Sequence, residues 1–253
     1  MIHPCLMPPH STFFYVLLGF IISHLRKIGY NVDNEFEDTN GRLHMKSKAF
    51  ETLAGNVIKN LEKRNMEGYY FEDSKSCVEA IMKMMPEGSV VSWGGSMTMN
   101  ETGMMDALKA SNLTLIDRMT AKTPQESREI FAKTVLADYY FMSTNAITND
   151  GILVNIDGNA NRVACLTHGP SHVMILVGRN KFTASVEAAV ERVRNVASPA
   201  NAVRLNRNIP CGLTGSCHDC LSPECFCNQI VVTRRSGHVG RIKVFLINED
   251  LGY

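Results

Sequence analysis

Five cysteines near the carboxyl end form the pattern that points most directly to chemistry. They fall within seventeen residues and are Cys211, Cys217, Cys220, Cys225 and Cys227. Thiolates this close in sequence can converge on one soft metal, either zinc in a tetrahedral sulfur site or an iron–sulfur cluster. Cys217-x-x-Cys220 would supply two ligands, and Cys211 with either Cys225 or Cys227 would supply the other two. His218 offers a nitrogen ligand as an alternative to one of the sulfurs. The spacing matches neither a ferredoxin run nor a zinc ribbon, so free or disulfide-forming thiols stay an alternative.

A glycine pair marks a second candidate site. Trp93-Gly94-Gly95-Ser96 is expected to join a buried strand to a helix, and Thr98 with Glu101 predicts a capping box at the start of that helix. Backbone N–H groups and the helix dipole there can hold a carboxylate, phosphate or enolate oxygen, and the glycines allow close approach. Glycine pairs also form turns that bind nothing, and Glu101 would partly satisfy the site with its own charge. We predict substrate binding by Gly94, Gly95, Ser96 and Glu101.

A dense polar segment covers residues 143–161, with Arg162 directly after it. Its amides, carboxylates and hydroxyls are Thr144, Asn145, Asn149, Asp150, Asn155, Asp157, Asn159 and Asn161. They lie at the ends of two predicted strands, where they could orient a polar small molecule, and Arg162 could clamp a carboxylate. Asn and Asp are also ordinary turn residues, and Asp157-Gly158 could be a hairpin. Because these polar residues occur as a group, we interpret five of them as substrate-binding residues: Thr144, Asn145, Asp157, Asn161 and Arg162.

Two histidines precede a buried strand in Thr167-His168-Gly169-Pro170-Ser171-His172. With Lys181 nearby in sequence they could perform acid–base work, because histidine titrates close to neutrality. A histidine in a Gly-Pro turn is more often structural. Lys181 is kept as a candidate substrate-binding residue, and no catalytic residue is assigned.

Composition and missing motifs exclude several classes of function. The chain has 253 residues, 26 Lys plus Arg against 25 Asp plus Glu, and a net charge of +1, so it offers no basic field for nucleic acid. It holds no Gly-x-Ser-x-Gly elbow, no phosphate-binding loop ending in Gly-Lys and no complete Gly-x-Gly-x-x-Gly. We therefore expect neither a standard serine hydrolase, nor a nucleoside triphosphatase, nor a dinucleotide dehydrogenase.

Alternating helices and strands must position these residues. Apolar spacing predicts helices at 46–65, 74–85, 98–110, 123–136 and 183–197, with Thr123 as an N-cap. Strands are expected at 68–71, 89–93, 113–117, 138–142, 152–156, 173–177, 230–233 and 242–247, and 162–166 is either a strand or a helical turn. Strands separated by such helices indicate an α/β fold with a mostly parallel sheet covered on both faces.

The first 45 residues differ from the rest. The apolar run 13–22 spans only about half of a bilayer core, and Arg26 and Lys27 follow it instead of preceding it, which is unlike a signal peptide. Residues 31–41 are polar and turn-prone. Three interpretations fit these residues: a packed or mobile extension, a weak membrane anchor, or upstream sequence that precedes a true start at Met45. We favour the last, because a helix is expected directly after Met45.

Several short motifs resemble the lactate-utilisation (LUD) domain family. They include Ser92-Trp93-Gly94-Gly95-Ser96, Thr144-Asn145-Ala146-Ile147, Asn155-Ile156-Asp157-Gly158, Asn161-Arg162-Val163, Gly178-Arg179-Asn180-Lys181 and Gly240-Arg241-Ile242-Lys243. The resemblance covers about residues 46–253. It implies a layered fold similar to the NagB/RpiA/CoA-transferase group, and four cysteines, Cys211, Cys217, Cys220 and Cys227, as the expected metal ligands. Cys225 looks like an addition.

The resemblance also implies a pathway. Family members act in bacterial oxidation of L-lactate to pyruvate, beside iron–sulfur partner subunits. We expect a cytoplasmic oxidoreductase subunit that holds a small carboxylate-bearing ligand and an iron–sulfur cluster or zinc, with membrane association unlikely. The alternatives are a stand-alone transferase- or isomerase-like enzyme and a ligand-sensing protein, each with a structural cysteine cluster. The expected layout is an extension at 1–45, an α/β domain at 46–206, and a Cys-rich loop with strands at 207–253 that completes this domain.

Overall fold

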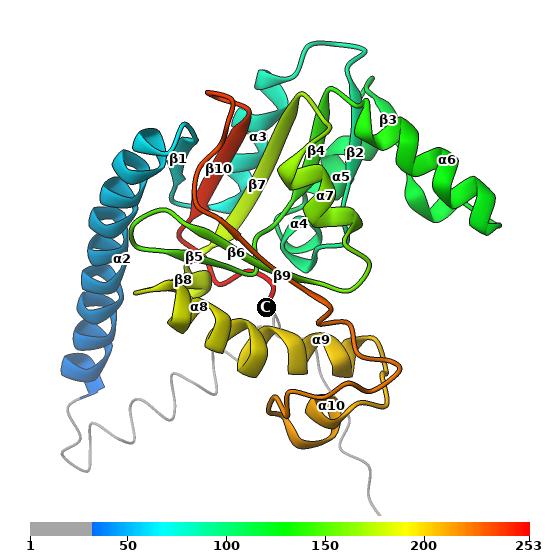
Figure 1. Cartoon of the computed structure of the whole chain (residues 1–253). Coiled ribbons are helices and arrows are strands. Elements are labelled where there is room, and N and C mark those ends of the chain that lie inside the picture. Colours follow the sequence, from blue (N-terminus) through cyan, green and yellow to red (C-terminus); the bar gives the residue numbers. More distant parts are fainter. Residues whose placement is uncertain (1–31) are drawn as a thin grey trace, which may run out of the picture. The chain divides into compact units, whose positions relative to one another are not determined.

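Six parallel strands make up the central sheet of the protein. In spatial order they are β1 (Glu67–Phe71), β10 (Ile242–Ile247), β7 (His172–Gly178), β4 (Tyr139–Met142), β2 (Val90–Trp93) and β3 (Thr114–Ile116), as Figure 1 shows. The structure is a computed structural model that describes the backbone of residues 32–253 and the side chains of residues 44–253. Parallel strands are covered on both faces, which explains the uninterrupted apolar run Val173–Val177 in β7.

A second sheet of four short strands lies beside the first. Its order is β8 (Phe182–Thr183), β5 (Ala146–Thr148), β6 (Leu153–Asp157) and β9 (Gln229–Thr233), with β6 antiparallel to both β5 and β9. The predicted strands 152–156 and 230–233 thus belong to an antiparallel ladder outside the main sheet. The sequence did not indicate this, because every residue of β6 is buried and the strand therefore has no solvent-exposed polar face of the kind that marks many antiparallel strands.

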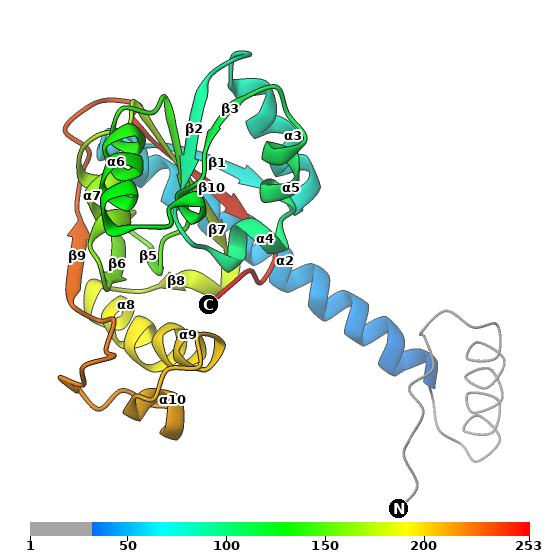
Figure 2. The same cartoon turned by 90° about the vertical axis from the view of Figure 1, so that its right-hand side faces the viewer.

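Helices cover both faces of the main sheet, as predicted. On one face lie α3 (Ser74–Met84), α4 (Met97–Glu101) and α5 (Met104–Lys109), which bury Ile81, Met99 and Leu108 against the strands. The opposite face packs against α7 (Asn161–Thr167), the second sheet and the part of α2 (Val32–Lys63) that starts at Phe50. The helix α6 (Pro124–Val135) contacts α7, and the two lie side by side in Figure 2.

A long helical region covers the outer face of the second sheet. It runs through α8 (Val186–Arg192), a π-helical segment (Val193–Ala197) and α9 (Ser198–Arg204), where one helix was predicted at 183–197. Ala189 and Val193 pack there against Val154 and Ile156 of β6. Short helical turns at Arg118–Thr120, Arg179–Lys181 and α10 (Pro210–Thr214) complete the described elements.

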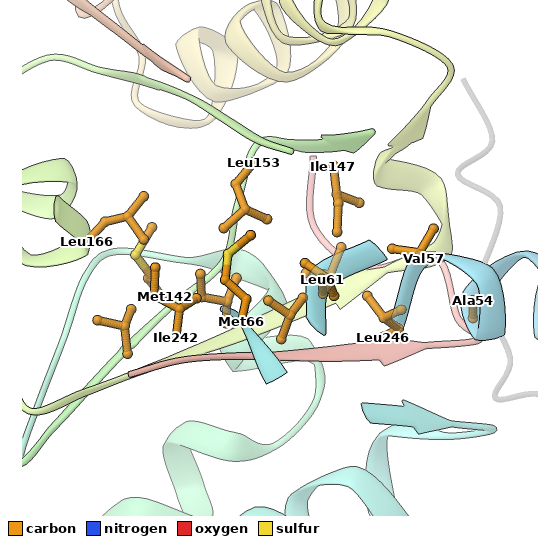
Figure 3. Packing of buried hydrophobic residues seen from close by; sticks show 14 of the residues in the cluster. Ala54, Val57, Leu61, Met66, Met142, Ile147, Leu153, Leu166, Ile242 and Leu246 are labelled. Carbon is orange, nitrogen blue, oxygen red and sulfur yellow. The ribbon is translucent and has the colours of Figure 1, made fainter. Parts of the chain in front are cut away.

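The largest buried cluster joins the main sheet to its neighbours. Leu61 of α2, Met142 of β4, Leu153 of β6 and Leu246 of β10 meet there, and Figure 3 shows how these side chains interlock. All four are fully buried. The main and second sheets are thereby fixed to each other through apolar contacts, so the loops at their ends hold a defined relative position.

Three local expectations were wrong. The helix 98–110 is split at Gly103, whose φ of 78° suits glycine, and Ser96 caps α4 in place of Thr98. The helix α2 begins at Val32 and not after Met45, so the segment 31–41 is helical from residue 32 where turns were predicted.

The chain divides into two units. The boundary lies between Ala49 and Phe50, and Phe50–Tyr253 forms one compact unit that includes the Cys-rich loop. No helix of the described chain has the length and apolar character needed to cross a bilayer. The apolar run 13–22 lies outside the described residues.

Candidate functional site

A cavity of about 530 Å³ opens where the main sheet's strands end. Its walls come from the loops after β2, β4 and β6, from the turn after β7, and on the far side from α9 and the Cys-rich loop. The carboxyl ends of parallel strands meet at one edge of a sheet, which is where ligands bind in α/β proteins. The position of this cavity therefore follows from the topology.

Eight of the ten predicted substrate-binding residues line this cavity: Gly95, Ser96, Thr144, Asn145, Asp157, Asn161, Arg162 and Lys181. Gly94 lies just behind the wall, where an added Cβ would come within 2.9 Å of the Tyr140 hydroxyl. Glu101 does not line it, because its carboxylate accepts a 2.6 Å hydrogen bond from the Gly252 N–H. Glu101 therefore anchors the segment 251–253 and does not cap its own helix.

Arg162 is a structural centre of the site and not the free carboxylate clamp that was predicted. Its two terminal nitrogens donate to the side chains of Asn155 and Asn145, at 2.5 and 3.0 Å, and to the carbonyl oxygens of Ser143 and Ile156. Its Nε lies 3.4 Å from Asp157 Oδ2. Four of the five N–H groups of the guanidinium donate hydrogen bonds within the protein, and the fifth, on Nε, faces the Asp157 carboxylate at ion-pair distance. None remains for a bidentate ligand.

The polar residues around Arg162 are likewise used to hold the wall. Asp157 accepts the N–H groups of Asn159, Ala160 and Val163 at the start of α7, which rules out the hairpin alternative at Asp157-Gly158. Asn145 Oδ1 also accepts the Ile156 N–H, at 3.0 Å. The segment 143–161 thus forms a hydrogen-bonded network that makes up one wall of the cavity. Most of its carboxylate and amide groups bond within the protein and not toward the cavity.

Lys181 is the most unusual group at the cavity wall. It is 3% exposed, and its ammonium donates to Thr98 Oγ1 at 2.8 Å and to Ser143 Oγ at 2.9 Å. No carboxylate of a described residue hydrogen-bonds to it. Burial, and then the nearby cations Arg192 and Arg162, lower the pKa of Lys181 to about 7. One of its three N–H donors has no partner among the described residues, so it is available to a ligand.

The two histidines are not part of this site. His168 and His172 line a separate cavity with Glu67, His238 and Lys243 at the opposite edge of the sheet. His168 precedes β7 and His172 is its first residue, whereas Lys181 follows the strand. The two ends of a seven-residue strand are about 20 Å apart. Acid–base cooperation between these histidines and Lys181 is therefore excluded by the fold.

Arg118 is a functional candidate that the sequence did not indicate. It lies in a short helical turn after β3 and reaches across to Gly95, where an added Cβ would be 2.7 Å from its Nη2. Its guanidinium makes no hydrogen bond or ion pair with another described residue. Glycine at position 95 is what makes room for this cation at the cavity wall. The residue lies in a stretch without any motif, so only the tertiary structure could reveal it.

Cations outnumber acids around the cavity. Its lining includes Arg118, Arg162, Lys181, Arg204 and Arg207, against the side-chain carboxylates of Asp157 and Glu224. Arg118 is unpaired and Lys181 has a spare donor, whereas Arg162 is saturated. The cavity is thus suited to a small anion, held by groups other than the predicted clamp.

The five clustered cysteines share a neighbourhood without converging on one centre. The pKa of the Cys211 thiol is raised by burial and then by the charges of Cys220 and Cys217, which shows that these sulfurs lie near one another. Yet Cys217 Sγ accepts from Arg194, Cys227 Sγ lies 3.4 Å from Ser198 Oγ, and all described cysteines are free. Within residues 44–253, no three His, Cys, Asp or Glu side chains are placed to share a metal ion.

The Cys-rich loop is nevertheless attached to the cavity. Cys225 and Phe226 line it, and Asn228 connects the loop to the polar network. The Asn228 N–H donates to the Asp157 carbonyl and its side-chain amide to the Gly158 carbonyl, both at 3.1 Å. An added Cβ at Gly158 would come within 3.0 Å of Phe226. The loop and the network therefore form one continuous wall.

Comparison with known proteins identifies the family. The profile of the LUD domain matches residues 55–247, which include the whole main sheet and every lining residue of the cavity except Tyr253. The chain belongs to the LUD domain family. None of the curated proteins with which this LUD protein was compared matches it.

Solved structures similar to the LUD protein are distant from it. A DUF162 family protein from Deinococcus radiodurans has 13% identity and a TM-score of 0.45, covering 78% of this chain and 97% of that chain. Ribose 5-phosphate isomerase A from Neisseria gonorrhoeae has 11% identity and a TM-score of 0.29, covering 45% and 54%. The delta subunit of eIF2B from Chaetomium thermophilum has 15% identity and a TM-score of 0.33, covering 72% and 68%.

The Arg162 network predicts a large loss of stability on a substitution that keeps the charge. Arg162→Lys retains a cation but cannot reach five acceptors, so buried oxygens of Asn155, Asn145 and Ile156 lose their partner. We expect the free energy of unfolding in urea to fall by about 3 kcal/mol. Arg204→Lys is the control, since Arg204 bonds only to Asn201, and it should change stability by less than about 0.5 kcal/mol. If the two variants lowered the free energy of unfolding equally, the stabilising role assigned to the Arg162 network would be wrong.

Lys181 predicts a specific dependence of stability on pH. Its pKa is about 7 in the folded protein and near 10.5 when unfolded, so between these values the unfolded state binds more protons. The cost of burying the ammonium is complete below pH 7 and is relieved as pH rises toward 10. Relative to Lys181→Met, wild-type stability should therefore rise by about 1 kcal/mol per pH unit between pH 7 and 10. The exposed-lysine variant Lys133→Met should run parallel to wild type in the same urea titrations. If the free energy of unfolding of Lys181→Met varied with pH in the same way as that of wild type, the lowered pKa of Lys181 would be refuted.

Proposed function

We propose that this LUD domain protein binds a small 2-hydroxy acid, L-lactate or a close relative, in the 530 Å³ cavity. It then acts as a cytoplasmic subunit of an oxidoreductase system that converts the acid to pyruvate. The observation that carries the proposal is Lys181, a buried amine with a pKa near neutrality and an unused donor at the wall of a cationic cavity. The resemblance of the sequence to lactate-utilisation proteins supports the choice of acid.

The unpaired groups suggest how such an acid would be held. The substrate carboxylate would pair with Arg118, whose guanidinium has no other described partner and lies against the Gly95 loop. The 2-hydroxyl would face Lys181 Nζ, which Thr98 and Ser143 hold in place through their hydroxyls. Arg162 would contribute its positive charge while its hydrogen bonds fix the wall.

Oxidation of the acid to pyruvate removes two electrons and two protons, one from the hydroxyl and one from C2, and the C2 proton would pass to solvent. An amine whose pKa is about 7 exists near physiological pH as both ammonium and neutral amine, and the neutral fraction of Lys181 can accept the hydroxyl proton. We propose that the electrons leave toward iron–sulfur partner subunits, which the family resemblance implies. The residues of this chain would bind and orient the acid and take up its proton.

A non-redox use of the same cavity is the second candidate. It is favoured by one observation: the cysteine side chains do not converge, yet the cavity's cations and its polar network are complete without them. In this case the protein would be a transferase- or isomerase-like enzyme, or a sensor that binds an acid without turnover. The cysteines would then only stabilise the loop at residues 211–227.

Calorimetric titration of the full chain tests the binding proposal. We expect L-lactate to bind, and propionate, which lacks only the hydroxyl, to bind at least about tenfold more weakly. Lys181→Met should lose this preference, because the group that faces the hydroxyl is gone, while Lys133→Met should keep it. Affinity for L-lactate should fall as pH rises through about 7, since the ammonium that attracts the anion is lost. Equal affinity of wild type for L-lactate and propionate would overturn the proposal.

Metal binding by the cysteines remains a prediction with its own test. If Cys211, Cys217, Cys220 and Cys227 hold an iron–sulfur cluster or zinc, protein purified without oxygen should contain iron and sulfide, or zinc, in stoichiometric amounts. Cys217→Ser should then abolish metal content and electron transfer from L-lactate to an added acceptor dye. Metal-free wild-type protein that still binds L-lactate would instead favour the non-redox candidate, and Cys217→Ser should then change only thermal stability.

A further inference from the structure

The surroundings of Lys181 are those of an amine nucleophile. A lysine attacks carbonyl groups when its amine is removed from water or lies near another cation, because both conditions favour the neutral form. Lys181 meets both conditions: it is 3% exposed, and burial and then the charges of Arg192 and Arg162 lower its pKa to about 7. The uptake of a proton from a hydroxy acid does not use the ability of this nitrogen to form a bond to carbon.

The two hydroxyl groups that hold the amine accept hydrogen bonds from it. The Thr98 hydroxyl donates its hydrogen to the Leu251 carbonyl at 3.2 Å, and the Ser143 hydroxyl donates its hydrogen to the Leu176 carbonyl at 2.7 Å. A hydroxyl has one hydrogen, so both groups present lone pairs to Lys181 Nζ, at 2.8 and 2.9 Å. Nζ must therefore donate to both of them.

This arrangement leaves the lone pair of the neutral amine free. A neutral amine has two N–H bonds and one lone pair, and here both N–H bonds are directed at Thr98 and Ser143. The lone pair then takes the third direction, in which the ammonium has its unused donor. Lys181 and both hydroxyl-bearing residues line the 530 Å³ cavity. The lack of a side chain at Gly252 keeps space next to the nitrogen, since an added Cβ there would lie 3.3 Å from Nζ.

The charges of the cavity favour one class of carbonyl compound. Cations outnumber carboxylates among its lining residues, so a carbonyl compound that carries a carboxylate is attracted more strongly than a neutral ketone. In a 2-oxo acid the carbonyl carbon is bonded directly to the carboxylate. When Arg118 pairs with that carboxylate, as proposed for the hydroxy acid, the carbonyl carbon takes the place of the hydroxyl-bearing carbon next to Lys181.

We propose that Lys181 forms an imine with the carbonyl carbon of a small 2-oxo acid bound in this cavity. The lone pair of Nζ attacks the carbonyl carbon and forms the C–N bond. The C–O bond then breaks, and the oxygen leaves as water together with the two N–H hydrogens of the amine. No electrons are gained or lost. The choice of acid rests on the proposed function, because pyruvate is the product of that oxidation.

Reductive trapping tests the covalent bond, because sodium cyanoborohydride converts an imine into a stable amine. After incubation of the full chain with pyruvate near neutral pH, we expect the intact mass to rise by one reduced pyruvate group. Peptide mapping should place this group on Lys181. Lys181→Met should gain none, whereas Lys133→Met, which removes an exposed lysine, should gain as much as wild type. The peptide map of wild type remains decisive if Lys181→Met does not fold.

The pH dependence distinguishes Lys181 from surface lysines within the same samples. Modification of Lys181 should increase up to about pH 7 and then level off, because the amine is mostly neutral above its pKa. Ordinary lysines have a pKa of about 10.4, so their modification should keep increasing toward that value. An adduct that is spread over several lysines, an adduct of folded Lys181→Met, or unmodified wild type would overturn the proposal.

Competition separates this inference from the proposed function. L-Lactate should suppress the modification of Lys181 by pyruvate, because both acids would occupy one cavity. An adduct on Lys181 that L-lactate does not reduce would support the covalent site and contradict the proposed function. Calorimetric binding of L-lactate without any adduct from pyruvate would contradict the covalent site alone.

Discussion

The guanidinium of Arg162 is the constraint on which the site depends. It joins the ends of β4 and β6 and the start of α7. Its N–H groups are directed at oxygens of these segments, so no pair of donors is left for a bidentate ligand. Its side chain is 14% exposed, and this burial is tolerable because its N–H groups face oxygens and Asp157 balances the charge. Gly94 is part of the same constraint, since any side chain there would displace either Tyr140 or the arginine itself.

Such a rigid network lets the protein bury a second cation next to the first. Among the residues whose side chains the structure describes, Lys181 has no carboxylate partner, and the hydroxyls of Thr98 and Ser143 are the groups that hold its ammonium. In a looser wall the lysine would rotate toward water, and its pKa would return to the ordinary value. The depressed pKa is therefore a property of the whole network and not of the lysine alone. It places the amine's protonation equilibrium near physiological pH, where a proton acceptor is most useful.

The sequence predicted the main elements and the location of the site, because both depend on local patterns. Helical spacing located α3 and α6, and apolar runs located β4, β7 and β10, so the parallel sheet and its functional edge followed. The roles of individual residues were less predictable. Arg162 was assigned to a ligand, because a sequence cannot show that five acceptors from distant positions converge on it. Arg118 was missed because its importance arises from tertiary proximity to Gly95. The antiparallel second sheet was missed because β5 and β8 have only three and two residues.

The attachment of the Cys-rich loop through Asn228 has a mechanical consequence. Immediately after the last clustered cysteine, the chain hydrogen-bonds to the Asp157 and Gly158 carbonyls and then pairs with β6 along β9. A change in the conformation of the Cys-rich loop would therefore displace the peptide groups of Asp157 and Gly158. Because the Asp157 carboxylate accepts N–H groups at the N-terminus of α7, that end of the helix would move as well. Because Asn161 and Arg162 at the start of α7 line the 530 Å³ cavity, a displacement of this turn would change the shape of that cavity.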